Sequence, residues 1–342
     1  MAKPRLMLIG CGTVGVGLLE IIQKKKTDIS LVAISDFKKG SINCPDGLHI
    51  DKILNILHEG RSLDEYSCNN GNCGCTLNKG WDALKTIREC DADIMAEMTF
   101  TDLKTGQPAT QHIEEALKRG MNVTTSNKGP AALYYNKLKK LADDNGVKFL
   151  IEGTVMSGTP VFNLTRECFA GCDITQVKGI LNGTTNYILT KMEQEGWSYE
   201  DALKKAQELG YAEADPTADV EGFDALAKVV ILSNVLLGGH VKPDDVPCQG
   251  ISSITLEDIK AAAAENMRYK LIGSTRREGN KIIASVKPVK LPMTDPLTGV
   301  NGANNALTFT TDLLGDVTIQ GAGAGKIETG FSIFVDLLNI IR

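Results

Sequence analysis

The sequence contains no hydrophobic run long enough to cross a membrane. A membrane-spanning helix needs about 18 or more consecutive apolar residues, and no stretch of the 342 residues approaches that length. The basic and apolar start, MAKPRLMLIGCGTVG, ends in glycines and not in a small-residue cleavage site, so it predicts a first strand and not a signal peptide. A basic excess is also lacking: the formal net charge is −5, which argues against a general nucleic-acid binder.

The sequence also lacks a CxxC pair. Its nine cysteines are an odd number in a chain too long to need disulfide staples, which indicates a reducing compartment and predicts a cytoplasmic location. Three thiols, Cys68, Cys73 and Cys75, lie close together, but the nearest histidine is His58. We therefore expect a surface loop of reduced thiols here and not a structural metal site.

Strands and helices alternate along the first 150 residues. The predicted strands are 5–9, 30–35, 91–99, 122–128 and 147–155, and the predicted helices include GLLEIIQKK, 112–120 and 133–146. This alternation predicts an α/β fold, a doubly wound parallel (Rossmann-like) sheet, in a dinucleotide-binding domain over residues 1–150. Residues 40–80 are rich in Gly, Asn and Cys, so we expect an insertion or long loop there with a short helical piece around 53–58.

The pattern changes after residue 155. Helical patterns dominate from 187 to 237, and alternating stretches return at 281–291 and 305–312. This predicts a second, α+β domain for catalysis and dimerisation over residues 151–320. A glycine-rich turn then precedes an apolar helix, and we expect this terminal segment, 321–342, to return to the first domain. The sequence shows no internal repeat and no low-complexity tract.

A GxGxxG motif follows the first predicted strand and opens the first helix. Gly10 would permit the tight turn, Gly12 would let the backbone approach a pyrophosphate, and Gly15 would let helix and strand pack closely. Asp36 stands 21 residues beyond Gly15, at the end of the second strand. The motif in this context predicts dinucleotide binding, with the phosphates at the helix N-terminus.

The choice between NAD and NADP stays open at the end of the second strand. Asp36 could accept hydrogen bonds from both ribose hydroxyls, which favours NAD. Lys38 and Lys39 follow at once and could hold a 2′-phosphate, which favours NADP.

An acidic segment, LGYAEADPTADVEGFDALAK, occupies residues 209–228. From about Val220 it reads as a helix that Asp219 is placed to cap, and Asp224 and Lys228 become neighbours on one helix face. Such a pair is usually a solvated surface ion pair. Here the helix continues as VVILSNVLLG, which is apolar almost all round, so its charges need partners or a ligand.

The segment KGILNGTTNYIL predicts a strand that runs into a tight turn and then a helix. The turn residues Asn182, Gly183 and Thr184 would offer N–H groups and hydroxyls to a small polar ligand. A plain turn with a helix cap explains the same pattern equally well.

At this point the chain resembles homoserine dehydrogenase along nearly its whole length. The motifs that carry the resemblance are GCGTVG, TSNKG around Lys128, EGTVMSGTPV at 152–161, GILNGTTNYIL, ELGYAEADPTADVEGFDALAK and the terminal GAGAGKIETG. The acidic motif is the most specific of them and the glycine-rich opening the least. The resemblance implies an NAD(P)-dependent oxidoreductase that interconverts L-homoserine and L-aspartate 4-semialdehyde, in threonine and methionine biosynthesis.

The resemblance also implies roles for single residues. Lys228 and Asp224 are expected to handle the proton, with Lys128 as a second lysine between cofactor and substrate. The substrate-binding residues it implies are Glu213, Asp219, Asn182, Gly183 and Thr184, and the cofactor-binding residues are Gly10, Gly12, Thr13, Val14, Gly15, Asp36, Lys38, Thr99, Lys128 and Gly325. The roles of the two lysines agree with the chemistry of the reaction, because a positioned ammonium stabilises the alkoxide that forms when an alcohol and an aldehyde are interconverted. Carboxylates, in turn, suit the ammonium of a zwitterionic substrate.

Further expectations concern ions, partners and regulation. The resemblance implies a monovalent cation, usually sodium, in the loop that contains Glu152, Val155, Ser157 and Thr159, and a GAGAG segment, 321–325, that closes over the nicotinamide. It also implies a homodimer or higher homo-oligomer, and neither a membrane nor a nucleic acid is expected as a partner. No regulatory or kinase domain is recognised in the sequence, so we expect no threonine feedback through an attached domain.

Two other functions fit the same motifs. One is another NAD(P)-dependent amino-acid or semialdehyde oxidoreductase. The other is an NAD(P)-binding regulator without turnover, against which Lys128, Asp224 and Lys228 argue.

Overall fold

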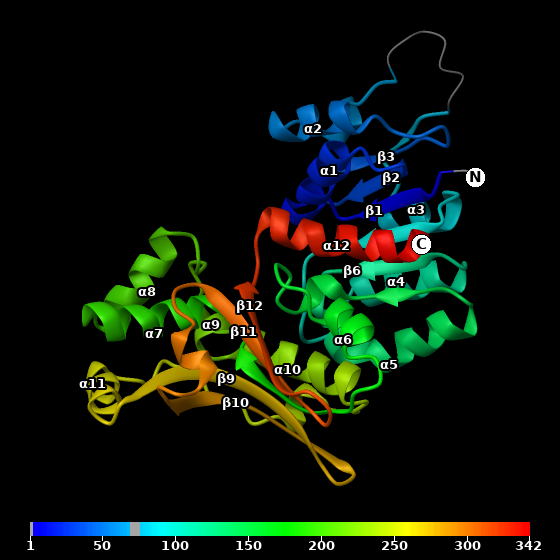
Figure 1. The fold of residues 1–342 in the computed structure, drawn as a ribbon. Helices are drawn as coiled ribbons and strands as arrows, with labels where there is room; N and C mark the ends of the chain where they lie inside the picture. The colour runs from blue at the N-terminus through cyan, green and yellow to red at the C-terminus, as the bar shows by residue number, and fades with distance from the viewer. Residues whose placement is uncertain (1–2, 69–75) are drawn as a thin grey trace. The chain divides into compact units, whose positions relative to one another are not determined.

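The computed structural model describes residues 3–68 and 76–342. The chain divides into two compact units: unit 1 comprises Met1–Ser157 and Gly325–Arg342, and unit 2 comprises Gly158–Ala324. Figure 1 shows that unit 1 consists of short strands with helices between them, whereas unit 2 contains long antiparallel strands.

Unit 1 is built on a seven-stranded sheet with the order β4-β3-β2-β1-β5-β6-β7. The strands from β2 to β7 in that order run parallel, whereas β3 and β4 are antiparallel additions at one edge. The strands are β1 (Arg5–Ile9), β2 (Ser30–Asp36), β3 (Gly40–Asn43), β4 (Asn78–Lys79), β5 (Ile94–Glu97), β6 (Asn122–Thr125) and β7 (Phe149–Leu150). The central strands are apolar and buried along almost their whole length, as expected of a parallel sheet with both faces covered. This confirms the predicted doubly wound α/β fold.

The helices of unit 1 follow the strands in the order the sequence predicts. They are α1 (Thr13–Lys25), α2 (Ile50–His58), α3 (Ala83–Glu89), α4 (Ala109–Lys118), α5 (Lys128–Asp144) and α12 (Lys326–Ile341). β1 lies at the centre of the sheet, with β2 on one side of it and β5 on the other. Strand order therefore reverses between β1 and β5, and ligands of doubly wound sheets bind at the carboxyl ends of strands at such a point.

Residues 40–80 are not the insertion or long loop that their composition suggested. The segment adds β3, a 3-10 turn (Leu63–Glu65) and β4 to unit 1, and the helical piece expected around 53–58 is confirmed as part of α2. Ile42, Ile53 and Tyr66 are fully buried in the core of unit 1, which explains the difference, because apolar side chains spaced between polar residues supply the packing. Cys68 is half-buried and packs against this core, while Cys73 and Cys75 lie outside the described residues.

The strand expected over 147–155 is also shorter than predicted. Only β7 pairs with the sheet, and a 3-10 turn follows over Glu152–Thr154. The Glu152 amide donates to the Asp336 side chain at 3.1 Å instead of continuing the ladder.

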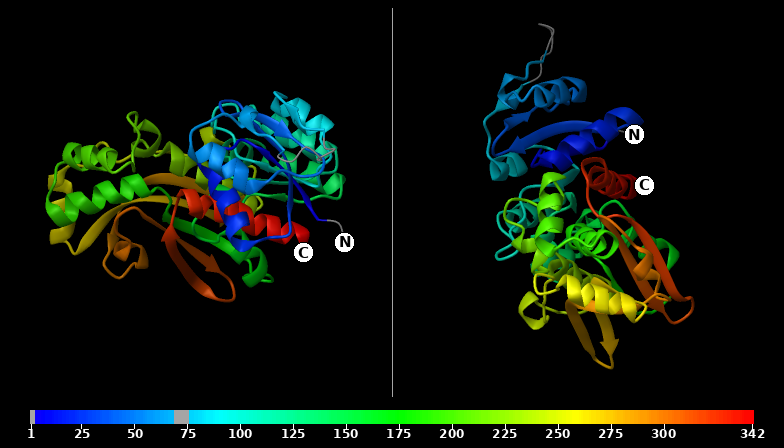
Figure 2. Two further views of the ribbon diagram at one scale, coloured as in Figure 1. Left: turned by 90° about the horizontal axis from the view of Figure 1, so that it is seen from above. Right: turned by 90° about the vertical axis from the view of Figure 1, so that its left-hand side faces the viewer.

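The terminal helix α12 packs against α1 in unit 1, as Figures 1 and 2 show. Its residues Ile333, Phe334 and Leu337 are buried in the core. The two helices cross closely at a glycine: a Cβ on Gly17 would lie 2.2 Å from the Lys326 carbonyl oxygen.

Unit 2 is built on a five-stranded antiparallel sheet with the order β10-β9-β8-β11-β12. The strands are β8 (Ile174–Ile180), β9 (Met267–Glu278), β10 (Lys281–Pro292), β11 (Asn304–Thr311) and β12 (Gly315–Ala322). Its helices are α6 (Phe162–Cys168), α7 (Gly183–Glu195), α8 (Tyr199–Glu208), α9 (Thr217–Val220), α10 (Phe223–Leu236) and α11 (Leu256–Ala264), with 3-10 turns at Pro243–Asp245 and Pro296–Gly299. Helices α7 and α10 pack on this sheet, and α10 is buried over most of its length, as its apolar sequence predicts.

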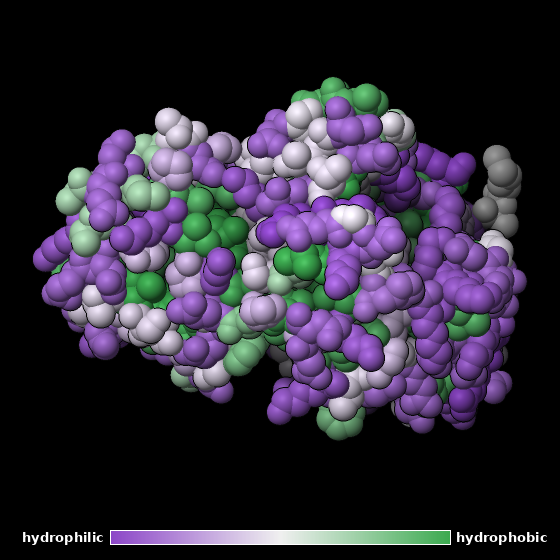
Figure 3. All heavy atoms as spheres, turned by 90° about the horizontal axis from the view of Figure 1, so that it is seen from below, coloured by the Kyte–Doolittle hydropathy of each residue, from purple (hydrophilic) through white to green (hydrophobic). Residues whose placement is uncertain are grey.

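Among the residues that the structure describes, none of the helices has the length and apolar character that a bilayer crossing needs. Hydrophilic residues cover most of the face drawn in Figure 3, and hydrophobic residues gather there only in small groups.

Candidate functional site

The glycine motif of unit 1 has the geometry that its sequence predicts. Gly10 has φ of +87°, and a Cβ there would lie 2.5 Å from the Met98 carbonyl oxygen. Gly15 lies against Gly10, whose carbonyl oxygen would be 3.1 Å from an added Cβ, whereas nothing lies within 4 Å of a Cβ on Gly12. Gly12 therefore leaves space for a ligand at the start of α1, where free N–H groups favour phosphate.

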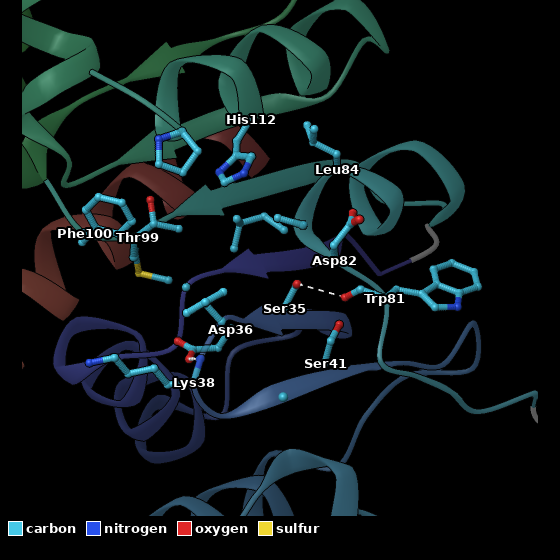
Figure 4. Close-up of a pocket in the computed structure, with 18 of the residues that line it drawn as sticks. Ser35, Asp36, Lys38, Ser41, Trp81, Asp82, Leu84, Thr99, Phe100 and His112 are labelled. Carbon is cyan, nitrogen blue, oxygen red and sulfur yellow. Dashed lines mark hydrogen bonds between the residues drawn. The ribbon is translucent and has the colours of Figure 1, made fainter. Parts of the chain in front are cut away.

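A pocket of about 650 Å³ opens beside this turn, at the carboxyl ends of β1, β2 and β5 (Figure 4). The predicted cofactor-binding residues that line it are Gly10, Gly12, Asp36, Lys38 and Thr99. Thr13 and Val14 begin α1 and are not among its lining residues, and neither is Gly15. The glycine turn, Asp36 at the end of β2 and Thr99 after β5 therefore line the same pocket.

Asp36 is held by the backbone around it. Its carboxylate accepts from the amides of Cys11 at 2.7 Å and of Lys38 and Lys39 at 2.9 Å. The Lys39 ammonium donates to the Cys11 carbonyl at 2.7 Å. Of the two lysines considered for a 2′-phosphate, Lys39 is thus engaged with the glycine turn, and Lys38 lines the pocket.

Lys128 is the first residue of α5, directly after β6. Asn127 caps this helix by accepting from the Gly129 amide at 3.1 Å, and its own side chain donates to the Phe100 carbonyl at 2.9 Å. Lys128 is half-buried. The strand expected over 122–128 ends earlier, at Thr125, so Lys128 is helical, although it still follows the carboxyl end of a strand of the sheet.

In unit 2, the Asp224–Lys228 pair forms as the helical spacing predicts. The Lys228 ammonium donates to Asp224 at 2.7 Å and to the Leu181 carbonyl at 2.6 Å, and Lys228 is only 8% exposed. This is not the solvated surface pair that such spacing usually gives. Leu181, directly after β8, and one helix turn of α10 therefore meet at a single buried ammonium.

Asn182 links this pair to a second carboxylate. Its side-chain amide donates to Asp219 at 2.6 Å and to Asp224 at 3.0 Å, while its side-chain oxygen caps α7 through the Thr185 amide. The Thr184 hydroxyl lies 2.7 Å from the Tyr211 carbonyl oxygen and 3.2 Å from Asp219, and these two acceptors share its single proton. Burial, followed by the nearby Asp224 charge, raises the pKa of Asp219. Gly183 belongs to the same turn: a Cβ there would lie 2.6 Å from the Ala303 carbonyl oxygen.

This cluster of Asn182, Thr184, Asp219, Asp224 and Lys228 contains two carboxylates and one ammonium. It can therefore offer an ammonium to an oxygen atom and acidic oxygens to a cationic group. The sequence-based role of Asp219 as a cap of the following helix is wrong, because Asp219 lies within α9 and Gly222, at φ of +84°, is the residue before α10. Glu213 is exposed in the loop before α9, and its main-chain carbonyl accepts from the Gln207 side chain at 3.1 Å.

The four residues expected at a monovalent cation divide between the units. Glu152, Val155 and Ser157 belong to unit 1, and Thr159 belongs to unit 2. Glu152 is 3% exposed, and the Ser157 hydroxyl lies 2.7 Å from that of Thr329. The Thr159 hydroxyl donates to the Ala322 carbonyl at 3.2 Å. Among the described residues, no group of three or more His, Cys, Asp or Glu side chains could hold a metal ion.

The GAGAG segment is only partly a turn. Gly321 and Ala322 end β12, and Gly325, at φ of +149°, is the residue before α12.

Sequence reasoning missed several residues of the unit 1 pocket. Trp81, Asp82 and His112 line it, and Figure 4 shows the His112 ring directed into it from α4. No motif marks them. Trp81 and Asp82 lie between the segment 40–80 and the strand expected at 91–99, where no element was predicted, and His112 is buried on α4. Glu97, at the end of β5, was also missed, although a lone acid at the end of an apolar strand is a usable signal.

The comparisons with known proteins match nearly the whole chain to one family. A family model described as homoserine dehydrogenase matches residues 160–338, and one described as the NAD-binding domain of homoserine dehydrogenase matches residues 10–152. An NAD(+)-dependent homoserine dehydrogenase from Pseudomonas canavaninivorans is 44% identical, over 99% of this chain and 97% of that protein. A homoserine dehydrogenase from Methanocaldococcus jannaschii is 40% identical, over 98% of each chain.

Solved structures give the same result. A putative homoserine dehydrogenase from Archaeoglobus fulgidus superposes with a TM-score of 0.87 at 37% identity, over 99% of each chain. A hyperthermophilic archaeal homoserine dehydrogenase in complex with NADPH superposes with a TM-score of 0.82 at 31% identity, over 99% of this chain and 98% of that one.

Proposed function

The chain belongs to the homoserine dehydrogenase family, NAD(P)-dependent oxidoreductases of amino-acid biosynthesis, and from this premise we propose how its residues divide the work. The reaction interconverts L-homoserine and L-aspartate 4-semialdehyde. The observation that carries the proposal is the buried Lys228 ammonium, held between Asp224 and the Leu181 carbonyl.

Lys228 acts on the reacting oxygen of the substrate. When the alcohol is oxidised its oxygen must lose a proton, and in the reverse direction the oxygen must gain one. A buried ammonium stabilises the alkoxide character of the transition state more strongly than an exposed one, because water is excluded. Asp224 fixes the lysine through the 2.7 Å bond, and Lys128 of unit 1 is the second ammonium assigned to the same chemistry. The bound dinucleotide supplies or accepts the hydride.

The acidic side of the cluster holds the amino group of the substrate. A free amino acid carries an ammonium group. The two carboxylates of Asp219 and Asp224 outnumber the single ammonium of Lys228, so one carboxylate is left for the substrate. Asn182 and Thr184 keep Asp219 in place, and Gly183 belongs to the turn beside it. Glu213, from the same acidic segment, is the further carboxylate assigned to the substrate.

The charges of the unit 1 pocket favour NAD over NADP. Its charged lining residues are Asp36, Asp64, Asp82 and Lys38, which are three acids and one base. A 2′-phosphate would add negative charge to this set, whereas ribose hydroxyls can donate to Asp36. The relative from Pseudomonas canavaninivorans is NAD(+)-dependent, which supports the same preference.

The donors around Glu152 suit a monovalent cation. A buried carboxylate, a hydroxyl and main-chain carbonyls are hard oxygen ligands, and the absence of a carboxylate-rich group among the described residues disfavours a divalent ion there. Glu152, Val155, Ser157 and Thr159 would hold the cation, which would stiffen the loop after β7.

The proposal includes a cytoplasmic homo-oligomer. Cys11, Cys90, Cys168, Cys172 and Cys248 are free thiols, consistent with a reducing compartment. The edge strand β12 has many exposed residues, so a second copy could pair with it across a two-fold axis. Equilibrium sedimentation of the purified chain tests the assembly.

The direct test of function is turnover of L-homoserine with NAD+ and with NADP+, measured by the absorbance of the reduced nicotinamide. We expect reduction of NAD+ that depends on homoserine. A panel of other hydroxy acids is the control for the substrate. Binding of NAD+ without any turnover would support a regulator, and faster turnover of another hydroxy acid would support a different oxidoreductase.

A further inference from the structure

Glu97, the last residue of β5, is a buried carboxylate that none of the roles above uses. Its side chain is fully buried. Its carboxylate accepts hydrogen bonds from the Thr99 amide at 3.1 Å and from the Thr99 hydroxyl. The Thr125 hydroxyl lies 3.0 Å from Glu97 Oε2 and 2.9 Å from the Glu97 carbonyl oxygen, so these two oxygens share its single proton. A buried carboxylate is costly unless its oxygens are hydrogen-bonded, and these donors are all neutral.

The two carboxylate oxygens of Glu97 contact two different segments of the chain. Oε1 binds Thr99, in the loop after β5 that lines the nucleotide pocket. Oε2 binds Thr125, at the end of β6. The carboxylate therefore bridges the carboxyl ends of neighbouring strands, at the edge of the sheet where doubly wound folds bind ligands.

The bonds continue from Thr125 to the start of α5. The Thr125 hydroxyl accepts from the Asn127 amide at 2.9 Å. The Asn127 side chain then caps α5 and donates to the Phe100 carbonyl. Lys128 is the next residue, so its main chain is fixed by a continuous set of bonds that begins at Glu97.

A residue that lines the nucleotide pocket, His112, also lies close to the Glu97 carboxylate. His112, which lines the pocket from α4, is 6% exposed, and its Nδ1 lies 3.9 Å from Glu97 Oε1 with no hydrogen-bond partner among residues 3–68 and 76–342. Glu97 thus lies between the residues around the nucleotide pocket and the residues around Lys128 (Figure 4 shows Thr99 and His112).

We propose that Glu97, acting through Thr125 and Asn127, is a positioning residue that sets Lys128 relative to the nucleotide pocket. This inference rests on the proposed role of Lys128. A displacement of about 1 Å in a catalytic group can lower the rate on the order of 10²-fold, so a polar chain that fixes the first residue of α5 has a direct effect on turnover.

The neighbouring threonines of β6 provide a matched test. Thr124 and Thr125 are both fully buried, and adjacent strand residues point to opposite faces of the sheet. The Thr124 hydroxyl donates to Asp336 at 2.9 Å, away from Glu97. Replacing either one by valine removes one buried hydroxyl from the same strand, but only Thr125→Val breaks the link to Asn127.

The experiment compares kcat, the Kd of NAD+ and Tm for Thr125→Val, Thr124→Val and Thr125→Ser in the full chain. We expect both valine variants to lose Tm to a similar extent. Thr125→Val should lower kcat about tenfold or more without a matching change in the Kd of NAD+, because the Thr99 contacts of Glu97 stay in place. Thr125→Ser should restore kcat, and Thr124→Val should keep it.

Two results would overturn the inference: full turnover in Thr125→Val, or an equal loss of kcat in Thr124→Val. Lys128→Ala is measured alongside. If Lys128→Ala keeps full turnover, the proposed role of Lys128 fails. If it loses turnover and Thr125→Val does not, only the positioning role of Glu97 fails.

Discussion

At the scale of single residues, the buried environment of Lys228 decides its importance. Lys228→Ala should lower kcat by about 10² or more, in line with the loss of a charge stabiliser or proton donor. Lys228→Met keeps the apolar stem of the side chain and should lose as much turnover with a smaller loss of stability. Lys191 is the control, since it pairs with Glu195 four residues away on an exposed helix face. Near-normal kcat in Lys228→Met would remove Lys228 from the mechanism.

The raised pKa of Asp219 indicates that its ionised form, which the substrate ammonium requires, lowers the stability of the folded chain. Because burial and Asp224 raise its pKa in the folded state, the folded chain disfavours ionised Asp219, and stability falls as the pH rises through that pKa. Asp219→Asn removes this penalty, so its Tm should exceed that of the wild type at neutral pH. The gain should shrink as the pH falls toward 3.8, the ordinary value, where both states become neutral.

The same variant should bind substrate less well. Loss of one hydrogen-bonded charge should raise the KM for homoserine about tenfold or more. Asp215→Asn is the matched control, because Asp215 is an exposed acid of the same segment whose pKa is lowered by its bonds to Thr217. A wild-type KM in Asp219→Asn would exclude Asp219 from the substrate site.

Asp82 permits a test of cofactor selectivity that leaves its helix intact. Its carboxylate lines the pocket and caps α3 through the Lys85 amide at 2.7 Å, and asparagine caps helices equally well. Asp82→Asn should therefore shift the ratio of the Kd values of NADP+ and NAD+ toward NADP+, by about fivefold at low salt and less at high salt. Asp91→Asn, an exposed acid elsewhere in unit 1, should leave the ratio unchanged. An unchanged ratio in Asp82→Asn would mean that pocket charge does not set the preference.

At the scale of secondary-structure elements, the crossing of α1 and α12 depends on glycine. A Cβ on Gly17 would meet a main-chain oxygen at 2.2 Å, and one on Gly330 would meet the Leu18 amide nitrogen at 2.7 Å. Gly17→Ala should therefore lower the free energy of unfolding by about 1–3 kcal/mol or more, as overpacking does. Urea denaturation measures this loss. Gly299→Ala, where nothing lies within 4 Å and φ is ordinary, should cost nothing, and an equal loss there would contradict the packing argument.

The elements that sequence reasoning predicted well are those with a strong local signal. The strands at 5–9 and 30–36 are continuous apolar runs, and the pair Asp224–Lys228 follows from helical spacing alone. The failures share a different cause. Residues 40–80, apart from the helical piece expected around 53–58, carry glycines and polar residues that resemble a loop, but Ile42 and Tyr66 are buried in the core of unit 1. The role of Asp219 depends on Asn182, 37 residues away, and no local pattern encodes such a bond.

At the scale of the whole molecule, unit 1 is discontinuous, since its last helix comes from the end of the chain. Ile333, Phe334 and Leu337 of α12 are buried in its core. Burying each is worth about 1.5–3 kcal/mol, so together they contribute about 5–9 kcal/mol. That sum is comparable to the whole stability of a typical domain, about 5–15 kcal/mol. Residues 1–157 by themselves should therefore fail to fold.

Restoring α12 should restore the unit. The Ser157 and Thr329 hydroxyls lie 2.7 Å apart, so the two ends that need joining are close in space. A Gly/Ser linker of about eight residues has a root-mean-square span of ~15 Å, enough to connect residue 157 to residue 325. The linked chain contains Trp81 in the pocket wall and lacks Trp197, so its tryptophan fluorescence reports the nucleotide pocket alone. We expect cooperative unfolding and saturable quenching by NAD+ from the linked chain and neither from residues 1–157; binding by residues 1–157 would show that α12 is dispensable for the pocket.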